Sequence, residues 1–186
     1  MHSVELLPDE ATDRAVREVW RRLADEGLPS QAAHRHPTNR PHLTLVSADT
    51  LPAEIRGRLR QAFAGLPVPL RLDGLVRFSG RMQVLAWAVR PDDVLLHLHE
   101  TVWRIVREAP QSGRPNSHLA PARWAPHITL GRGRDTAWDV PDNRLLPATA
   151  DASAVATGLW TEARYYDSLT RTTGRLGPGP ERPCQP

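Results

Sequence analysis

Apolar positions recur along the chain with two different periods, and the longer period predicts three helices. Between Asp9 and Gly27 apolar residues fall on one helical stripe, so we expect a helix that Asp9 caps and that ends at Gly27. The same spacing predicts a second helix over residues 52–64, capped by Thr50. A third helix is expected from residue 91 to residue 109.

Shorter apolar runs between these helices predict strands. The run 82–90 is apolar on both faces, which is typical of a central strand covered on both sides. Helices that alternate with strands of mixed burial indicate an α+β or α/β domain. The other strands are expected at residues 4–7, 66–78, 154–161 and 164–173, and long polar loops at residues 29–40, 110–124 and 136–154.

The composition is that of one ordinary globular domain. The chain has 186 residues, of which 40% are hydrophobic and 24% charged, so neither a disordered protein nor a membrane protein is indicated. The net charge is +3 and every cation is arginine, a mild bias and not a nucleic-acid-binding stripe. No apolar stretch approaches the ~20 residues of a membrane span, and nothing at the N-terminus is typical of a signal peptide. We therefore expect a cytoplasmic protein.

The C-terminal residues 177–186 are rich in proline and glycine, and we expect them to be a disordered tail after a domain of residues 1–176. The tail contains Cys184, the single cysteine of the sequence. One cysteine cannot form an internal disulfide, and in such a tail it lacks a fixed partner for catalysis. We regard it as incidental.

One element occurs twice, almost half the chain apart. Residues 40–45 read Arg-Pro-His-Leu-Thr-Leu and residues 125–130 read Ala-Pro-His-Ile-Thr-Leu. Residues i and i+2 of a strand share a face, so each copy is expected to present its histidine and threonine together and to bury its aliphatic residues. The residues concerned are His42, Thr44, His127 and Thr129.

Such a pair suits phosphoester transfer by acid and base. In-line displacement at phosphorus needs a base on the attacking oxygen and an acid on the leaving oxygen. Histidine fills either role near neutral pH. Threonine hydroxyls donate to the non-bridging oxygens and oppose the charge there. Two His-x-Thr units that face each other across a cleft supply all four groups.

The two motifs, His42-Leu43-Thr44-Leu45 and His127-Ile128-Thr129-Leu130, resemble those of the 2H phosphoesterase superfamily, which includes 2′-5′ RNA ligases and cyclic phosphodiesterases. The resemblance implies an α+β fold of two lobes, with antiparallel sheets around a central cleft and helices outside. It also implies a metal-independent enzyme without cofactor that hydrolyses or forms 2′-5′ or 2′,3′-cyclic phosphodiester bonds.

By the same resemblance the two histidines are the acid and base, and the two threonines bind the phosphate. Arg132, five residues after His127, is a candidate substrate contact. Its strand parity is wrong unless Gly131 makes a bulge. The expected partner is RNA or a small nucleotide, with no membrane, and we expect a monomer.

Other interpretations of the sequence stay open. A binding protein would hold a phosphate or an RNA end in the same cleft without turnover. A metal hydrolase is disfavoured, because the motifs have threonine where a second ligand is wanted. The pair His97 and His99 fits a partly buried helix face, since residues i and i+2 of a helix point apart.

Several residues outside the motifs are weighed individually. His34, His36 and His118 lie in polar loops and are interpreted as solvated, with a lid over the cleft as the alternative for the first two. Trp124 is expected in the core, or stacked on a base. Tyr165 and Tyr166 must point to opposite faces of a strand, so one of them can line the cleft.

Overall fold

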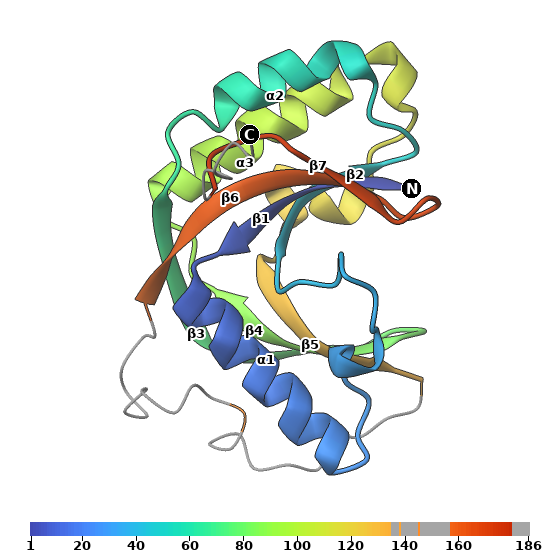
Figure 1. Ribbon diagram of the computed structural model, residues 1–186. Coiled ribbons are helices and arrows are strands. Elements are labelled where there is room, and N and C mark those ends of the chain that lie inside the picture. Colours follow the sequence, from blue (N-terminus) through green and yellow to red (C-terminus); the bar gives the residue numbers. More distant parts are fainter. Residues whose placement is uncertain (135–137, 139–144, 146–156, 180–186) are drawn as a thin grey trace, which may run out of the picture.

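The computed structural model describes residues 1–134, 138, 145 and 157–179. Within these residues the strands form one antiparallel sheet in the order β2-β1-β6-β3-β4-β5, with β7 added to β6 (Figure 1). The strands are β1 (His2–Pro8), β2 (Leu43–Ala48), β3 (Val68–Phe78), β4 (Gln83–Val89), β5 (His127–Gly133), β6 (Thr157–Asp167) and β7 (Thr172–Arg175). The helices are α1 (Glu10–Asp25), α2 (Arg56–Ala62) and α3 (Asp93–Arg107).

Strand β3 divides this sheet into two lobes. Its first half, residues 68–71, pairs with β6, and its second half, residues 75–78, pairs with β4. The register slips between the halves, where Gly74 has a φ of 81°, a conformation that glycine adopts without strain. The first lobe holds β1, β2, β6 and β7, and the second holds β4 and β5. The end strands β2 and β5 contact each other across the molecule.

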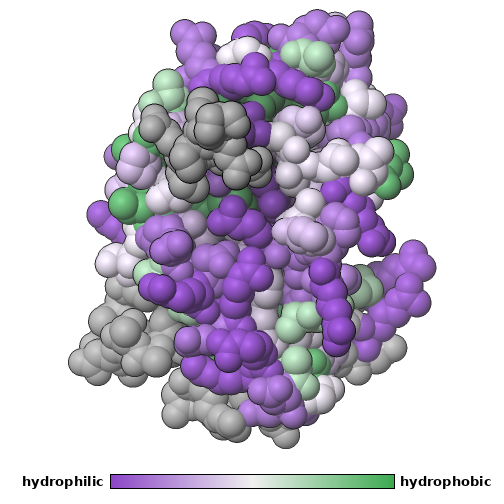
Figure 2. Space-filling model, viewed as in Figure 1, coloured by the Kyte–Doolittle hydropathy of each residue, from purple (hydrophilic) through white to green (hydrophobic). Residues whose placement is uncertain are grey.

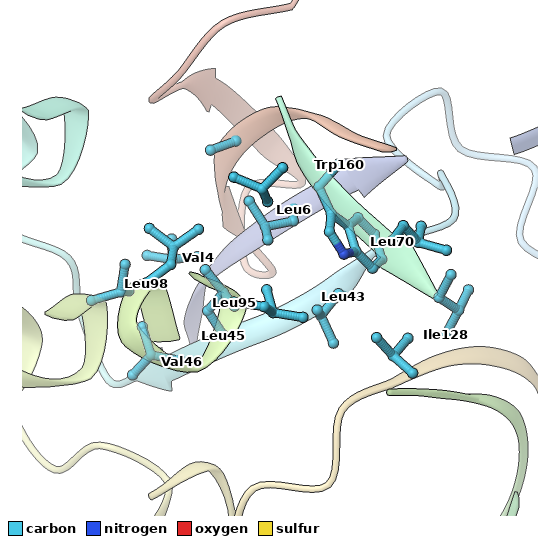
Figure 3. Packing of buried hydrophobic residues seen from close by; sticks show 14 of the residues in the cluster. Val4, Leu6, Leu43, Leu45, Val46, Leu70, Leu95, Leu98, Ile128 and Trp160 are labelled. Carbon is cyan, nitrogen blue, oxygen red and sulfur yellow. The ribbon is translucent and has the colours of Figure 1, made fainter. Parts of the chain in front are cut away.

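The helices cover the outer faces of the lobes. Helices α2 and α3 lie over the first lobe, and α1 lies along the second (Figure 1). The predicted cap of α1 is confirmed, because the Asp9 carboxylate accepts a hydrogen bond from the backbone N–H of Thr12 at 2.8 Å. Leu95 and Leu98 of α3 pack toward Leu45 and Val46 of β2 (Figure 3). A buried cluster continues through both lobes, from Val4 in β1 to Ile128 in β5.

The second predicted helix differs from its prediction. The chain makes a 3₁₀ turn over Ala53–Ile55 before α2 begins, and no side chain caps either element. The hydroxyl of Thr50 instead donates to the carbonyl of Gln111 at 2.7 Å, which ties this segment to the loop after α3. The predicted cap is therefore wrong, because a tertiary partner binds the hydroxyl.

The two strands predicted at residues 154–161 and 164–173 are also placed incorrectly. Residues 157–167 form the single strand β6, and β7 follows only at Thr172. The prediction left residues 162–163 out of both strands, but they lie within β6, where Glu162 pairs with Arg40 and Arg164 with Glu5. Residues 154–156, most of the loop 136–154 and, in the tail, residues 180–186 with Cys184 lie outside the described residues.

The predicted central strand and the segment 110–124 agree with the fold. Strand β4 lies between β3 and β5, and Trp87 in it is 1% exposed. The segment 110–124 holds three short 3₁₀ turns, Pro110–Ser112, Ser117–Leu119 and Pro121–Arg123. None of the helices among the described residues has the length and apolarity to cross a membrane. The face shown in Figure 2 is mostly hydrophilic, including the region over α1.

Candidate active site

The two His-x-Thr motifs lie on β2 and β5, the strands that meet where the lobes face each other. His42 directly precedes β2 and His127 is the first residue of β5. Leu43, Leu45, Ile128 and Leu130 are at most 1% exposed, while both histidines and both threonines are half-buried. The predicted alternation of faces is therefore confirmed in both copies.

Both imidazoles are fixed in the same way by the chain two residues before them. Nδ1 of His42 lies 2.7 Å from the carbonyl oxygen of Arg40, and Nδ1 of His127 lies 2.7 Å from that of Ala125. A carbonyl only accepts, so Nδ1 carries the hydrogen in each ring. In the neutral form this leaves Nε2 with a free lone pair, able to take a proton. The proline between carbonyl and histidine restricts the backbone and supports this geometry.

A β-bulge follows the threonine in each motif. Glu5 pairs with Thr44 and Val4 with Val46, so Leu45 has no opposite residue. In the second motif Ala86 pairs with Thr129 and Leu85 with Gly131, so Leu130 has none. The repeat in the sequence is thus a repeat in backbone conformation, and each bulge re-aims the residues after it.

Each bulge is held by a tryptophan from another part of the chain. The indole N–H of Trp124 donates to the carbonyl of Thr44, and that of Trp20 in α1 donates to the carbonyl of Thr129, both at 3.1 Å. Trp124 also stacks on the buried His99, with ring centroids 3.8 Å apart. Trp124 therefore supports the first motif, which agrees with the expectation that it belongs to the core.

We expect the variant Trp124→Phe to lose about 1–3 kcal/mol of unfolding free energy, because the Thr44 carbonyl loses its donor. Urea denaturation measures this loss, and an accompanying fall in kcat indicates a displaced Thr44. Trp160→Phe is the matched control, since the Trp160 Nε1 is buried without a hydrogen-bond partner. It removes ring volume and no hydrogen bond. An unchanged kcat in Trp124→Phe contradicts the positioning role.

A polar cavity of about 560 Å³ lies between the lobes and brings together residues from both motifs. His42, Thr129 and Arg132 line it. Because strand residues alternate between faces, Arg132 shares the face of Thr129 only if one residue between them is unpaired. The structure has such a bulge, but the unpaired residue is Leu130 and not Gly131 as predicted. Gly131 instead allows a close approach of two backbones. A Cβ there would overlap the carbonyl oxygen of Pro29, so the loop before β2 packs directly on it.

His127 lies near His42 and Arg132, and burial and these positive charges lower its pKa. Its ring contacts Phe78, with centroids 4.7 Å apart. Burial lowers the pKa of His127 below its usual value, and the charges of Arg132 and His42 lower it further against the hydrogen bond to Ala125. His127 is thus biased toward its neutral, proton-accepting form.

The cavity is rich in cations. Arg35, Arg132, Arg164 and Arg171 line it, and among its described lining residues Glu5 is the carboxylate that opposes them. Arg164 is paired with Glu5, since its Nε donates to Oε2 at 2.8 Å. The remaining positive charge favours an anionic ligand.

Several cavity residues carry no signal in the sequence. Glu5 lies in an apolar strand, and Arg164 fits the beginning of a predicted strand, so neither indicates a site. Tyr166 faces the cavity and Tyr165 the helices, where Arg56 lies 4.4 Å from its ring centroid. Tyr166 is therefore the tyrosine that lines the cleft. His34 and His36 border the cavity and both are exposed, which agrees with a solvated loop beside the cleft.

The other histidines lie apart from the site. His99 is fully buried in α3, and its Nε2 donates to the carbonyl of Leu119 at 3.0 Å. Burial lowers its pKa, so it is a neutral core residue. His97 and His118 are exposed, on α3 and in the loop after it. In the described part of the chain no three His, Cys, Asp or Glu side chains cluster as metal ligands.

A family model described as the 2′-5′ RNA ligase superfamily matches residues 8–162. The chain belongs to this superfamily. The resemblance to the 2H phosphoesterases, drawn from the two motifs, is thereby confirmed, and so is the α+β fold of antiparallel sheet with outer helices. No sequence among the curated proteins matches this chain.

Solved structures with the same fold include proteins bound to nucleotides. E. coli LigT complexed with NADP⁺ has a TM-score of 0.58 at 19% identity, over 96% of this chain and 94% of that one. E. coli LigT complexed with 3′-AMP has a TM-score of 0.55 at 22% identity, with the same coverage. Kluyveromyces marxianus Usb1 with uridine monophosphate has a TM-score of 0.53 at 16% identity, over 95% and 97%. At these identities the likeness shows the fold.

Proposed function

We propose that the protein is a metal-independent phosphodiesterase that hydrolyses, or in reverse forms, 2′-5′ or 2′,3′-cyclic phosphodiester bonds in RNA or nucleotides. The observation that carries the proposal is the matched pair of imidazoles, each with Nδ1 bound to a carbonyl and Nε2 free for proton transfer. Membership of the superfamily supports it.

The proposed reaction is an in-line displacement between the two motifs. One histidine accepts the proton of the attacking water or hydroxyl, and the other gives a proton to the leaving oxygen. The hydroxyls of Thr44 and Thr129 donate to the non-bridging oxygens, together with the guanidinium of Arg132. Donors fixed by the two bulges do not have to reorganise as charge develops on those oxygens, which lowers the barrier.

The proposed substrate is an RNA strand or a nucleotide, bound by a monomer in the cytoplasm; the monomeric state and the location stay predictions. Related folds hold uridine monophosphate in Usb1 and 3′-AMP in LigT. In this chain a second cavity of about 420 Å³ shares Trp20, His34 and Arg35 with the first and is also lined by Arg17 and Arg21. Arginine side chains in both cavities suit a strand with more than one phosphate.

The experiment that tests the proposal uses purified protein in EDTA. The substrates are 2′,3′-cyclic mononucleotides, short RNAs that end in a 2′,3′-cyclic phosphate, and 2′-5′-linked dinucleotides. Turnover in EDTA supports metal-free acid–base chemistry, and the position of the product phosphate identifies the bond that breaks. Activity that depends on added metal overturns the proposal.

A binding protein without turnover remains the second candidate, because an intact cavity with four arginines also suits a phosphate-binding site. Tight RNA binding with steep salt dependence and no product favours this alternative.

The pH dependence of activity tests whether His127, which its surroundings bias toward the neutral form, is the base. Because the charge of Arg132 lowers the pKa of His127, we expect Arg132→Gln to raise that pKa toward its usual value. A base with a higher pKa is deprotonated at higher pH, so the acidic limb of the kcat/KM profile moves upward. Arg104→Gln, on the exposed side of α3, is the control and leaves the profile in place. An unmoved acidic limb in Arg132→Gln contradicts the base role of His127.

A further inference from the structure

Only one of the two histidines has a carboxylate beside it within the described part of the chain. Oε1 of Glu5 lies 3.9 Å from Nε2 of His42, and Glu5 is 3% exposed. The carboxylate is fixed from two more sides. Ser3 donates to its Oε1 at 2.6 Å, and Arg164 donates to its Oε2 at 2.8 Å. A buried charge held this firmly has a defined position relative to the imidazole.

The internal repeat supplies a comparison within the same molecule. Glu5 is the residue opposite Thr44 across the first bulge, and Ala86 is the residue opposite Thr129 across the second. The position that is a carboxylate next to the first motif is thus a methyl group next to the second. Among the described residues no carboxylate lies within ion-pair distance of His127. The two halves are alike in geometry and differ in charge.

We propose that Glu5 is a positioning residue that assigns His42 as the general acid and leaves His127 as the general base. The inference rests on the proposed function. At 3.9 Å the carboxylate is too distant for a hydrogen bond, so Nε2–H of a protonated His42 stays available to the substrate while the charge is balanced. His127 instead lies near the cations Arg132 and His42, which favour its neutral form.

In the hydrolysis of a 2′,3′-cyclic phosphate the assignment gives a defined step. Nε2 of neutral His127 takes a proton from water as the water oxygen forms a bond to phosphorus. The bond from phosphorus to one ribose oxygen breaks, and that oxygen takes the proton from Nε2 of His42. His127 ends protonated and His42 neutral, and exchange with solvent restores both.

Other charged groups also face His42. Arg164 on β6 is the nearest partner of Glu5 and reduces its net effect. The same cavity is lined by Tyr166 on β6, Arg132 on β5, Arg171 in the β6–β7 turn and residues 34–36 of the loop before β2. The Glu5 carboxylate keeps its charge beside these groups. Burial raises the pKa of Glu5, but His42, Arg164 and the Ser3 hydrogen bond together lower it below its usual value.

The experiment compares the parent with Glu5→Gln, Glu5→Asp and the control Asp73→Asn, which removes a carboxylate from another arginine ion pair, with Arg90. Histidine-selective NMR follows the titration of His42 and His127, and kinetics in EDTA give the pH–rate profile. In Glu5→Gln we expect His42 to lose its proton at lower pH than in the parent, because the carboxylate 3.9 Å away is gone, and the basic limb of the profile to move the same way. His127 and the acidic limb stay in place, and Glu5→Asp restores most of the parent behaviour.

Loss of the carboxylate leaves Arg164 buried without its partner, so Glu5→Gln is also made together with Arg164→Met. This second variant keeps the test available if the single variant does not fold. Arg164→Met is made as the reference for this double variant, so that each comparison differs only in the carboxylate. A His42 titration that is the same in the parent and in Glu5→Gln, or the same in Arg164→Met and in the double variant, overturns the proposal. Because NMR needs no turnover, a parent without activity counts against the proposed function, while the His42 titration still tests the pairing with Glu5.

Discussion

Replacing either His42 or His127 by alanine is expected to lower kcat by about 10²–10⁴-fold, the usual contribution of general acid or base catalysis. In the proposed mechanism each imidazole acts through its Nε2, while its Nδ1 is bound to a backbone carbonyl at 2.7 Å. Both rings are half-buried at the beginning of a strand, so alanine removes the chemistry and little of the core. Steady-state kinetics with a 2′,3′-cyclic substrate in EDTA measure the loss.

The double variant His42→Ala/His127→Ala tests whether the two residues act in one step. Groups that act as a unit lose activity in a strongly non-additive way, so the double variant is expected to be little worse than the more damaged single one. His97→Ala, on the exposed side of α3, is the control and keeps full activity. Full activity in the double variant would contradict the proposed mechanism.

The motifs and their faces were predictable because they depend on short-range rules. A strand alternates its faces with period two, and a proline at its start restricts the chain. Because Pro-His-x-Thr-Leu occurs twice, it also predicted that the two His-Thr pairs face each other across a cleft. The same locality explains why the cap of α1 by Asp9 was predicted correctly, since a side chain and a backbone N–H three residues on decide it.

The residues that were missed depend on partners far along the chain. Glu5 and Arg164 form an ion pair between β1 and β6, and each looks out of place in its own strand. Thr50 fits a helix cap in sequence, yet its hydroxyl binds Gln111. Strand β6 was divided at residues 162–163 in the prediction, yet it is continuous, and Glu162 and Arg164 within it have ion-pair partners on other segments, Arg40 and Glu5. In each case the long-range partner, which no local pattern contains, overrides the local preference.

The two bulges were only partly predictable. From the sequence, Arg132 was expected to reach the cleft only if a bulge followed Thr129. Whether the strand has a bulge there could not be predicted from the sequence. The structure meets it with Leu130 unpaired, and repeats the same irregularity at Leu45. Trp20 and Trp124 bind the carbonyls at these two points. Aromatic residues with the pattern of core residues thus also hold the backbone in the conformation that the site requires.

Thr44→Val and Thr129→Val are each expected to lower kcat by about 10²–10³-fold, the effect of removing one donor to a developing oxyanion. Valine keeps the branched shape and strand preference of threonine, so the bulges and the packing of β2 and β5 persist. Both side chains are half-buried beside their histidines, and Thr129 lines the cavity. Because the donors oppose charge that develops in the transition state, kcat should fall more than KM rises.

The matched control is Thr173→Val on the exposed strand β7, which makes the same chemical change in a strand away from the motifs. It leaves kcat and KM unchanged. If Thr44→Val and Thr129→Val raise KM and keep kcat, the hydroxyls bind the phosphate equally in the ground state and the transition state, which contradicts their role as oxyanion donors. If neither constant changes, the phosphate lies elsewhere in the cavity. A fall in kcat at both positions places it between β2 and β5, within reach of both histidines, because each threonine shares its strand face with one of them.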